Sequence, residues 1–229
     1  MRSPAFWNSA SAMGVVSTGA TGAGRVASRA ALSRIIALSS CSSRESALIE
    51  KSRVLWSKKK KLWLFVVPHT LENCVALKKL GVKDVPSPIL YYYDWPRSYK
   101  IANPFHAQRE TAAFLTLHDR AHVHNGLGTG KTLSSLWAWD YLNKEGLAKR
   151  LLVIAPLSTI ERAWADTVFE NFAHRTCAVL HGTRKRRLAM LDEDVDIYII
   201  NHDGLTVTGV LDALAARPDI DTVIIDELS

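Results

Sequence analysis

A glycine-rich segment between a predicted strand and a predicted helix constrains the fold of this chain more than any other feature. The apolar stretch 119–124 predicts a strand, the letters GLGTGKT follow it, and the periodic stretch 131–144 predicts a helix. Glycines let the backbone curl so that successive N–H groups point at phosphate oxygens, and the following helix adds the positive end of its dipole. The arrangement predicts a phosphate-binding loop within an α/β fold.

The residues of this loop are the expected nucleotide contacts. We assign nucleotide binding to Gly128, Thr129, Gly130, Lys131 and Thr132. Lys131 is also assigned to catalysis because its ammonium group reaches the β- and γ-phosphates, and the Thr132 hydroxyl is the expected Mg²⁺ ligand. The implied cofactors are ATP and Mg²⁺. The alternative is a chance glycine-rich turn, and the strand and helix in register on either side favour the phosphate-binding interpretation.

Two acids end a short apolar run near the last residue of the sequence. Val223–Ile225 predicts a buried strand, and Asp226 and Glu227 follow it. A phosphate-binding loop needs a second carboxylate site, which makes Asp226 the expected partner of the metal and Glu227 the expected general base for water. The alternative is an exposed acid pair that caps a strand.

Helical and strand patterns alternate over the second half of the chain. Helices are predicted at about 105–117, 131–144, 157–172, 184–191 and 203–216, and strands at about 119–124, 151–155, 176–180, 196–200 and 222–226. This alternation indicates a central, mostly parallel sheet that is flanked by helices on both faces.

The first 61 residues differ in composition from the rest. They carry a formal charge of +9, while residues 62–229 carry −2, so the basic balance does not belong to a globular domain. We expect a basic, low-complexity and disordered tail at 1–61 that is dispensable for the fold. A non-native extension explains its composition better than an organellar transit peptide does. A small appendage at 62–103 follows, with a strand at 62–67 and a helix at 70–81 that Thr70 caps and Gly81 ends.

Five motifs in the right order resemble those of a known family. PFHAQRETAAFL resembles the Q motif, with Gln108 in the adenine-reading position, and NGLGTGKT resembles motif I. LLVIAPLSTIERAWADTV resembles motif Ia, with Pro156 and Trp164 in the usual places. YIINHDGL resembles motif Ib and VIIDELS resembles motif II. Residues 104–229 therefore resemble the first RecA-like lobe of a superfamily-two helicase-like ATPase, and most of all the short Swi/Snf-type translocases of phages and bacteria.

The resemblance implies an enzyme that uses Mg-ATP hydrolysis to move on duplex DNA without sequence preference. It also implies a second RecA-like lobe with arginine fingers, and further structure in the first lobe after motif II. We therefore interpret the chain as truncated after motif II, expect its sheet to be incomplete at the C-terminal end, and expect it to be inactive or very slow alone. Two departures from the family pattern are Asn125-Gly126, in place of an acidic pair, and Ser229, where motif II often has histidine. The expected setting is the cytoplasm of a bacterial or phage-infected cell.

Some features leave alternatives open. Backbone amides at 156–159 and 201–204 are the DNA contacts that the resemblance implies, and the basic run TRKRR at 183–187 is either a further DNA contact or a solvated helix face. Tyr91 or Tyr93 stacks on adenine or packs in the core. Two other functions remain alternatives: a non-catalytic nucleotide-binding fragment, and another P-loop motor such as a packaging ATPase.

Overall fold

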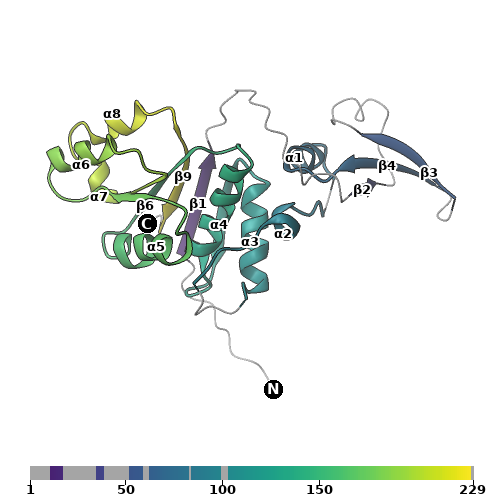
Figure 1. Cartoon of the computed structure of the whole chain (residues 1–229), viewed down its shortest axis with the longest axis horizontal. Coiled ribbons are helices and arrows are strands. Elements are labelled where there is room, and N and C mark those ends of the chain that lie inside the picture. Colours follow the sequence, from purple (N-terminus) through teal and green to yellow (C-terminus); the bar gives the residue numbers. More distant parts are fainter. Residues whose placement is uncertain are drawn as a thin grey trace, which may run out of the picture.

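The computed structural model describes residues 11–17, 35–38, 52–58, 62–82, 84–98 and 103–227. A six-stranded sheet forms its centre, in the strand order β5-β1-β9-β6-β8-β7 (Figure 1). The strands in that order are β5 (Arg120–Asn125), β1 (Ser11–Ser17), β9 (Ile220–Asp226), β6 (Arg150–Ala155), β8 (Ile197–Asn201) and β7 (Cys177–Val179). β9, β6, β8 and β7 are parallel to one another.

Helices cover both faces of this sheet. They are α3 (His106–Thr116), α4 (Lys131–Lys144), the π-helical η2 (Ile160–Ala165), α5 (Asp166–Asn171), α6 (Arg184–Leu191), α7 (His202–Leu205) and α8 (Val210–Ala215). The side chains of β6 alternate between two cores: Leu151 and Val153 join one, and Leu152 and Ile154 join the other. Burial on both faces explains why this strand is apolar from Leu151 to Ala155. The predicted RecA-like α/β fold is confirmed.

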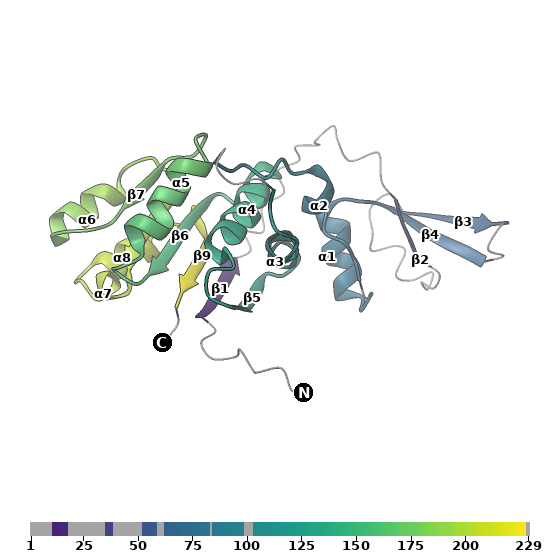
Figure 2. The ribbon, with the colours of Figure 1, turned by 90° about the horizontal axis from the view of Figure 1, so that it is seen from below.

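β1 is the element that the sequence did not predict. It runs antiparallel to both of its neighbours, β5 on one side and β9 on the other (Figure 2). Residues 11–17, 35–38 and 53–57, which form strands in the structure, lie within the tail that the sequence analysis expects at 1–61. Without β1, β5 and β9 would each have unpaired backbone N–H and C=O groups facing the space between them. β1 fills this space and forms backbone hydrogen bonds with both strands. The remainder of the expected tail lies mostly outside the described residues.

A second, three-stranded antiparallel sheet belongs to the N-terminal part of the chain. Its order is β2 (Ile35–Leu38), β4 (Leu62–Pro68) and β3 (Arg53–Ser57). α1 (Leu71–Lys79) and α2 (Ile89–Tyr92) follow. The Thr70 side chain accepts a hydrogen bond from the amide of Asn73, and Gly81 has φ +82° just after the helix, so both predicted ends of this helix are confirmed.

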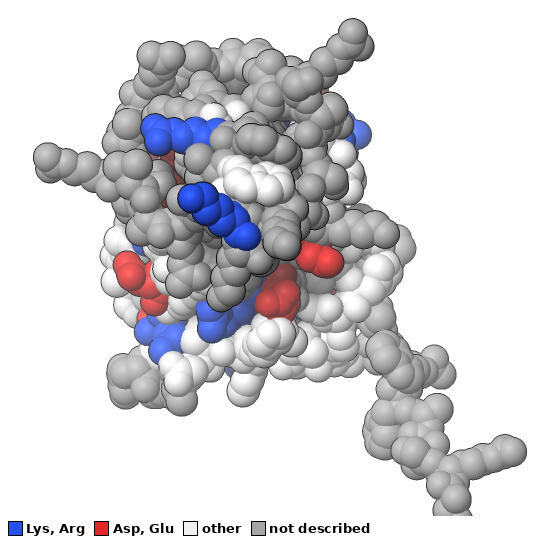
Figure 3. Space-filling view, turned by 90° about the vertical axis from the view of Figure 1, so that its right-hand side faces the viewer, with Lys and Arg blue, Asp and Glu red and all other residues white. Residues whose placement is uncertain are grey.

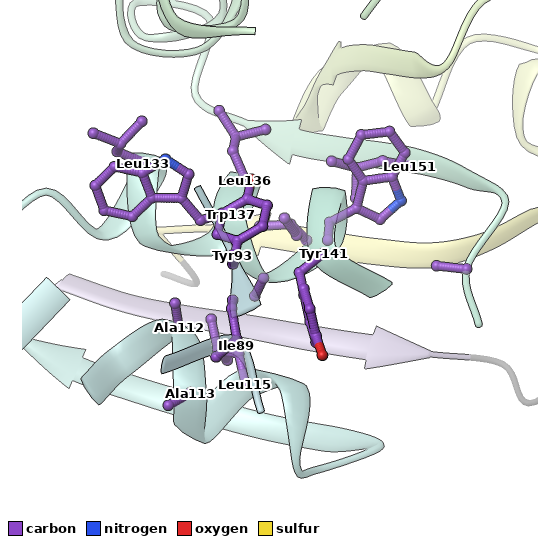
Figure 4. Close-up of a cluster of buried hydrophobic side chains, with 14 of the residues drawn as sticks. Ile89, Tyr93, Ala112, Ala113, Leu115, Leu133, Leu136, Trp137, Tyr141 and Leu151 are labelled. Carbon is purple, nitrogen blue, oxygen red and sulfur yellow. The ribbon is translucent and has the colours of Figure 1, made fainter. Parts of the chain in front are cut away.

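An aromatic cluster joins the appendage to the main sheet (Figure 4). Trp137 of α4 is fully buried, stands edge-on to Trp95 with ring centroids 5.3 Å apart, and donates its indole N–H to the carbonyl of Pro96 at 2.7 Å. Tyr93 packs edge-on against Tyr141. These contacts place the 84–98 connector and α4 in one hydrophobic core.

A buried carboxylate fixes the same connector. Asp140, in the middle of α4, accepts hydrogen bonds from the Tyr93 hydroxyl at 2.6 Å, from His174 Nε2 at 2.8 Å and from Arg175 Nε at 2.7 Å. Lys144 adds an ion pair at 3.1 Å. Burial alone would raise the pKa of Asp140, but the donated hydrogen bonds and the Arg175 charge outweigh it and hold this pKa below its ordinary value of 3.8.

Two predicted helices differ from the observed ones. The stretch predicted as one helix at 203–216 forms α7 and α8, because Gly209 takes φ +78° between them. The stretch at 157–172 begins only at Ile160, in the wider π-helical winding, and becomes α-helical at Asp166. The helix at 131–144 is confirmed to the residue.

Two properties of the described surface bear on partners. None of the helices in the described ranges combines the length and the apolar character that a membrane span requires. On the side that faces the viewer in Figure 3, described lysine and arginine side chains lie next to aspartate and glutamate side chains. The Lys79–Asp119 pair, with 3.7 Å between Nζ and Oδ2, is an exposed example of such pairing.

Candidate nucleotide-binding site

The glycine-rich loop connects β5 to α4 and adopts a conformation that depends on its glycines. Gly128 has φ +71° and Gly130 has φ +79°, both in the left-handed region that L side chains rarely adopt. The Thr129 hydroxyl donates to the carbonyl of Gly126 at 2.9 Å. α4 begins immediately after Gly130, so its free N–H groups open onto the loop.

Lys131 bends back across this loop. Its Nζ donates to the carbonyls of Asn125 and Gly126, each at 3.0 Å, and the residue is only 9% exposed. These two carbonyls hold the Lys131 ammonium group above the loop. Phosphate oxygens of a ligand can replace the carbonyls as its hydrogen-bond acceptors. The Asn125 side chain donates to the Thr111 hydroxyl at 2.9 Å, so the residue that departs from the general motif ties the loop to α3.

Gln108 of α3 lies directly against the loop. Its Oε1 accepts a hydrogen bond from the amide of Phe105 at 3.0 Å. A Cβ added to Gly130 would lie only 2.0 Å from its Nε2, too close for any side chain at that position. The residue is 8% exposed. A single carboxamide therefore connects the start of α3 with the last residue of the phosphate-binding loop.

Asp226 ends β9 and is nearly buried. Its Oδ2 accepts a hydrogen bond from the indole Nε1 of Trp164, at 3.0 Å. Glu227, the next residue, is exposed and has φ +54°, so its side chain and that of Asp226 are presented differently. Leu228 and Ser229 lie outside the described residues, and so does the expected departure at Ser229.

The loop and the acid pair lie at the same edge of the sheet. β5 and β9 are parallel to each other because both are antiparallel to β1, which pairs Ser11 with Asn125 and Met13 with Asp226. One strand separates them, so the backbones at the two strand ends are about 10 Å apart. Carboxyl ends of strands in open α/β sheets are where ligands bind, and a nucleotide triphosphate spans such a gap.

The residues at this edge fit ATP and Mg²⁺. The donors are backbone amides at a helix start and one buried ammonium group, which suit phosphate oxygens. The Thr132 hydroxyl and the Asp226 carboxylate supply the oxygen ligands that Mg²⁺ prefers. Thr132 is half-buried in the first turn of α4. The space beside Gly130, which a Cβ would need, is occupied by the Gln108 side chain.

The structure separates the basic run at 183–187 into two kinds of residue. Arg187 is 7% exposed and donates to the carbonyl of Leu180 and, at 3.0 Å and 3.2 Å, to the Gly182 carbonyl and to Asn201 Oδ1. It is therefore a structural residue that faces inward. Lys185 and Arg186 are exposed and remain accessible to a polyanion. Arg184 is exposed as well, and its Nε donates to the carbonyl of Thr208 at 2.7 Å.

Two further aromatic side chains lie on segments that bear on the expected adenine position. Tyr93 packs in the core, as one of the two alternatives proposed, because its hydroxyl binds the buried Asp140. Phe105 was not selected from the sequence, yet it is 70% exposed and sits one turn before Gln108, to which its amide is bound. The signal was present as an aromatic residue placed directly before the helix that carries Gln108.

The profile of the family described as "Type III restriction enzyme, res subunit" matches residues 90–228, which covers the loop, Gln108 and Asp226. Among solved structures, the chain is similar to the Sulfolobus solfataricus SWI2/SNF2 ATPase core in complex with dsDNA, with 24% identity and a TM-score of 0.39. That match covers 49% of this chain and 24% of the other. No curated protein matches the chain.

Proposed function

Because the chain belongs to the family of the type III restriction enzyme res subunit and carries a helicase-like ATPase lobe, we propose that this lobe binds and hydrolyses Mg-ATP to drive movement on duplex DNA. We also propose that this lobe is of the Swi/Snf type. The observation that carries it is the position of Lys131 over a loop bent by two left-handed glycines, at the sheet edge where β9 ends in Asp226.

Each residue of the site has a task in this proposal. Lys131 exchanges its two backbone carbonyls for β- and γ-phosphate oxygens, and its charge offsets theirs. Thr132 and Asp226 hold Mg²⁺, which would neutralise the charge that builds on the transferred phosphoryl group. Glu227, exposed at the edge, accepts a proton from the attacking water.

The base of the nucleotide belongs at the start of α3. Gln108 offers a carboxamide that can donate and accept at once, which matches the amino group and ring nitrogen of adenine. Phe105 presents an exposed ring one turn away and provides a stacking surface for the base. A base bound there would lie beside Gly130, since Gln108 already touches it.

The DNA part of the proposal rests on the loops that follow β6 and β8. The turn at 156–159 is held by the Thr159 amide and hydroxyl, which donate to the carbonyl of Pro156 at 2.9 Å and 3.0 Å. Leu157 and Ser158 between them are exposed. Backbone amides at such a turn contact phosphates without reading sequence.

The first experiment tests nucleotide binding with one pair of variants. Lys131→Ala removes the cation of the loop and should weaken binding of a fluorescent ATP analogue with Mg²⁺ by about 10- to 100-fold, the size of a lost charge-assisted contact. Lys149→Ala is the matched control, because Lys149 is exposed at the start of β6, at the opposite end of the sheet. Equal affinity of the two variants would contradict the site assignment.

The second experiment separates binding from chemistry. Glu227→Gln should keep Mg-ATP affinity within about twofold. It should lower the slow single-turnover hydrolysis expected of this chain to the uncatalysed background, since a general base usually contributes about 10²- to 10⁴-fold. Phe105→Ala should weaken ATP and GTP together, since stacking does not distinguish the bases. Gln108→Ala should weaken ATP more than GTP. If both variants lost the same affinity for ATP as for GTP, the proposal that the base binds at the start of α3 would be wrong.

A further inference from the structure

One hydrogen bond ties the proposed metal ligand to a tryptophan from a distant segment. Trp164 of η2 is fully buried, and its indole Nε1 lies 3.0 Å from Oδ2 of Asp226. Asp226 itself is 8% exposed, at the last position of β9. The contact therefore joins η2, which packs on the sheet, to the end of β9, a strand of that sheet. Both residues are buried, so water competes little for the carboxylate.

The chemistry of the indole group makes this contact one-sided. An indole N–H donates a hydrogen bond and has no acceptor, so it cannot bind a cation or take a proton from the acid. An ionised carboxylate is an acceptor with two oxygens. The bond uses Oδ2 and leaves Oδ1, which accepts no hydrogen bond from the residues that the structure describes.

We infer that Trp164 is a positioning residue for the metal site: its indole N–H holds the Asp226 carboxylate in one orientation, with Oδ1 kept for the divalent cation. This inference rests on the proposed function, in which Asp226 is a Mg²⁺ ligand. Groups that hydrogen-bond to a metal ligand orient it, and their loss typically lowers metal affinity by 10- to 100-fold. Without the indole donor, the carboxylate must be ordered when the cation binds.

The winding of η2 supports a specific role for this side chain. Ile160–Ala165 is π-helical, a conformation that is rare and frequently found at functional sites. The Ala163 amide donates to the carbonyl of Thr159 at 3.0 Å, which fixes the start of this segment to the turn at 156–159. Trp164 thus has a defined backbone on one side and the metal ligand on the other.

A matched tryptophan exists for comparison. Trp137 is as buried as Trp164 and also uses its indole N–H as a donor, to the carbonyl of Pro96 at 2.7 Å. Its acceptor belongs to the connector and not to the site. Trp164→Phe and Trp137→Phe therefore remove the same group from the same kind of environment, and only the first affects the Asp226 carboxylate.

The experiment measures metal binding on the full chain, with Mn²⁺ as the probe. Free Mn²⁺ is followed by electron paramagnetic resonance with the chain in molar excess over ATP, so that little Mn–ATP forms in solution, and ATP affinity is measured separately in EDTA. Trp164→Phe should weaken Mn²⁺ binding about 10-fold or more and leave metal-free ATP affinity within about twofold. Trp137→Phe should leave both unchanged. Equal Mn²⁺ affinity of Trp164→Phe and wild type would overturn the inference.

Asp226→Asn separates this inference from the proposed function. It should weaken Mn²⁺ binding strongly, and adding Trp164→Phe to it should cause no further loss, since the indole acts only through that carboxylate. A further loss of the original size would overturn the positioning role and leave the metal assignment intact. Wild-type Mn²⁺ affinity in Asp226→Asn would overturn the proposed metal site, and the inference with it.

A spectroscopic measurement covers the case in which Trp164→Phe does not fold. In ¹⁵N-labelled chain, with indole signals assigned through the backbone, Asp226→Ala should shift the indole N–H signal of Trp164 and speed its exchange with solvent. The Trp137 signal should stay in place. Mg²⁺ added to the ATP-loaded wild type should shift the Trp164 signal as well. A Trp164 signal that neither change moves would overturn the inference.

Discussion

The Gln108 side-chain amide occupies the space beside Gly130, so a Cβ on Gly130 would lie 2.0 Å from Gln108 Nε2. Gly128, two residues earlier, has a similar φ of +71° but nothing within 4 Å of its own Cβ position. The two glycines are therefore needed for different reasons. Gly128 is required for its backbone conformation, and Gly130 for its conformation and for the close approach of α3.

This difference predicts unequal effects of alanine at the two positions. Gly128→Ala should cost about 1–2 kcal/mol of unfolding free energy, the usual cost of a left-handed L residue. Gly130→Ala should cost about 1 kcal/mol more, because Gln108 must leave its bond to the Phe105 amide. Urea unfolding measures both. In a Gln108→Ala background, Gly130→Ala should cost no more than Gly128→Ala, because the hydrogen bond from Phe105 is already absent. Equal effects of the two glycine variants in the wild-type background would contradict the close contact.

Asp140 predicts a dependence of stability on pH. Its folded-state pKa is depressed, so it stabilises the fold above about pH 4, and this contribution is lost as the pH falls through the folded-state value below 3.8. Asp140→Asn should cost about 3–5 kcal/mol at pH 7, since it leaves the largely buried Arg175 guanidinium without its anionic partner. The gap between wild type and variant should narrow steadily in unfolding curves taken below pH 4.

Asp219 is the control for that series. The hydrogen bond from Arg217 lowers its pKa to about 2, but its side chain is 31% exposed. Solvent screening makes such a pair worth about 1 kcal/mol or less, so Asp219→Asn should change stability little at pH 7. If Asp219→Asn and Asp140→Asn lowered the free energy of unfolding by the same amount, burial of the carboxylate would not explain how much each pair stabilises the fold.

Arg187 and Arg186 predict opposite outcomes from neighbouring positions. Arg187→Ala should lower the free energy of unfolding by about 2–4 kcal/mol, because the buried Leu180 carbonyl and Asn201 Oδ1, and the partly buried Gly182 carbonyl, lose their donor. Arg186→Ala should change it by less than about 0.5 kcal/mol, as expected at an exposed site. If α6 contacts DNA, Arg186→Ala should also lower the slope of log affinity against log salt by about 1. Duplex binding by fluorescence anisotropy over a salt series measures this.

β1 predicts that part of the first 61 residues contributes to stability. Val15 pairs with Ala121 on one side and with Ile224 on the other, so Val15→Pro should cost about 3 kcal/mol through a lost ladder hydrogen bond and steric clash. Val15→Thr keeps a β-branched residue and should cost far less. Thermal unfolding compares them. Wild-type stability of Val15→Pro would support the sequence-based expectation that residues 1–61 can be removed.

Local signals explain what could be predicted from the sequence. The helix at 131–144 was predicted to the residue, because a glycine in the left-handed region precedes it and helix-forming residues follow. Asp226 and the loop residues were selected because each is marked by its own neighbours along the chain. In contrast, the break at Gly209 was missed because an apolar pattern continues across it, and periodicity alone cannot show a change in φ.

Contacts between distant segments explain what was missed. Trp164 was singled out by its place in a motif, but its bond to Asp226, 62 residues away, has no local signature. The burial of Arg187 depends on a carbonyl of the preceding strand end and on Asn201 of β8. Composition suggested that residues 11–17 cannot bury a core, yet a strand needs only two open backbone edges to be held.

The place of β1 also has a consequence for the order of folding. It pairs Met13 with Asp226, almost the whole described chain apart, and it is the strand that connects β5 with β9. Closing so long a loop costs entropy before any contact compensates for it, and such pairings slow the search for the native state. The β6-β8-β7 part of the sheet can form from nearer segments. The edge that holds the candidate site is then completed last, so refolding should restore helical signal before it restores nucleotide binding.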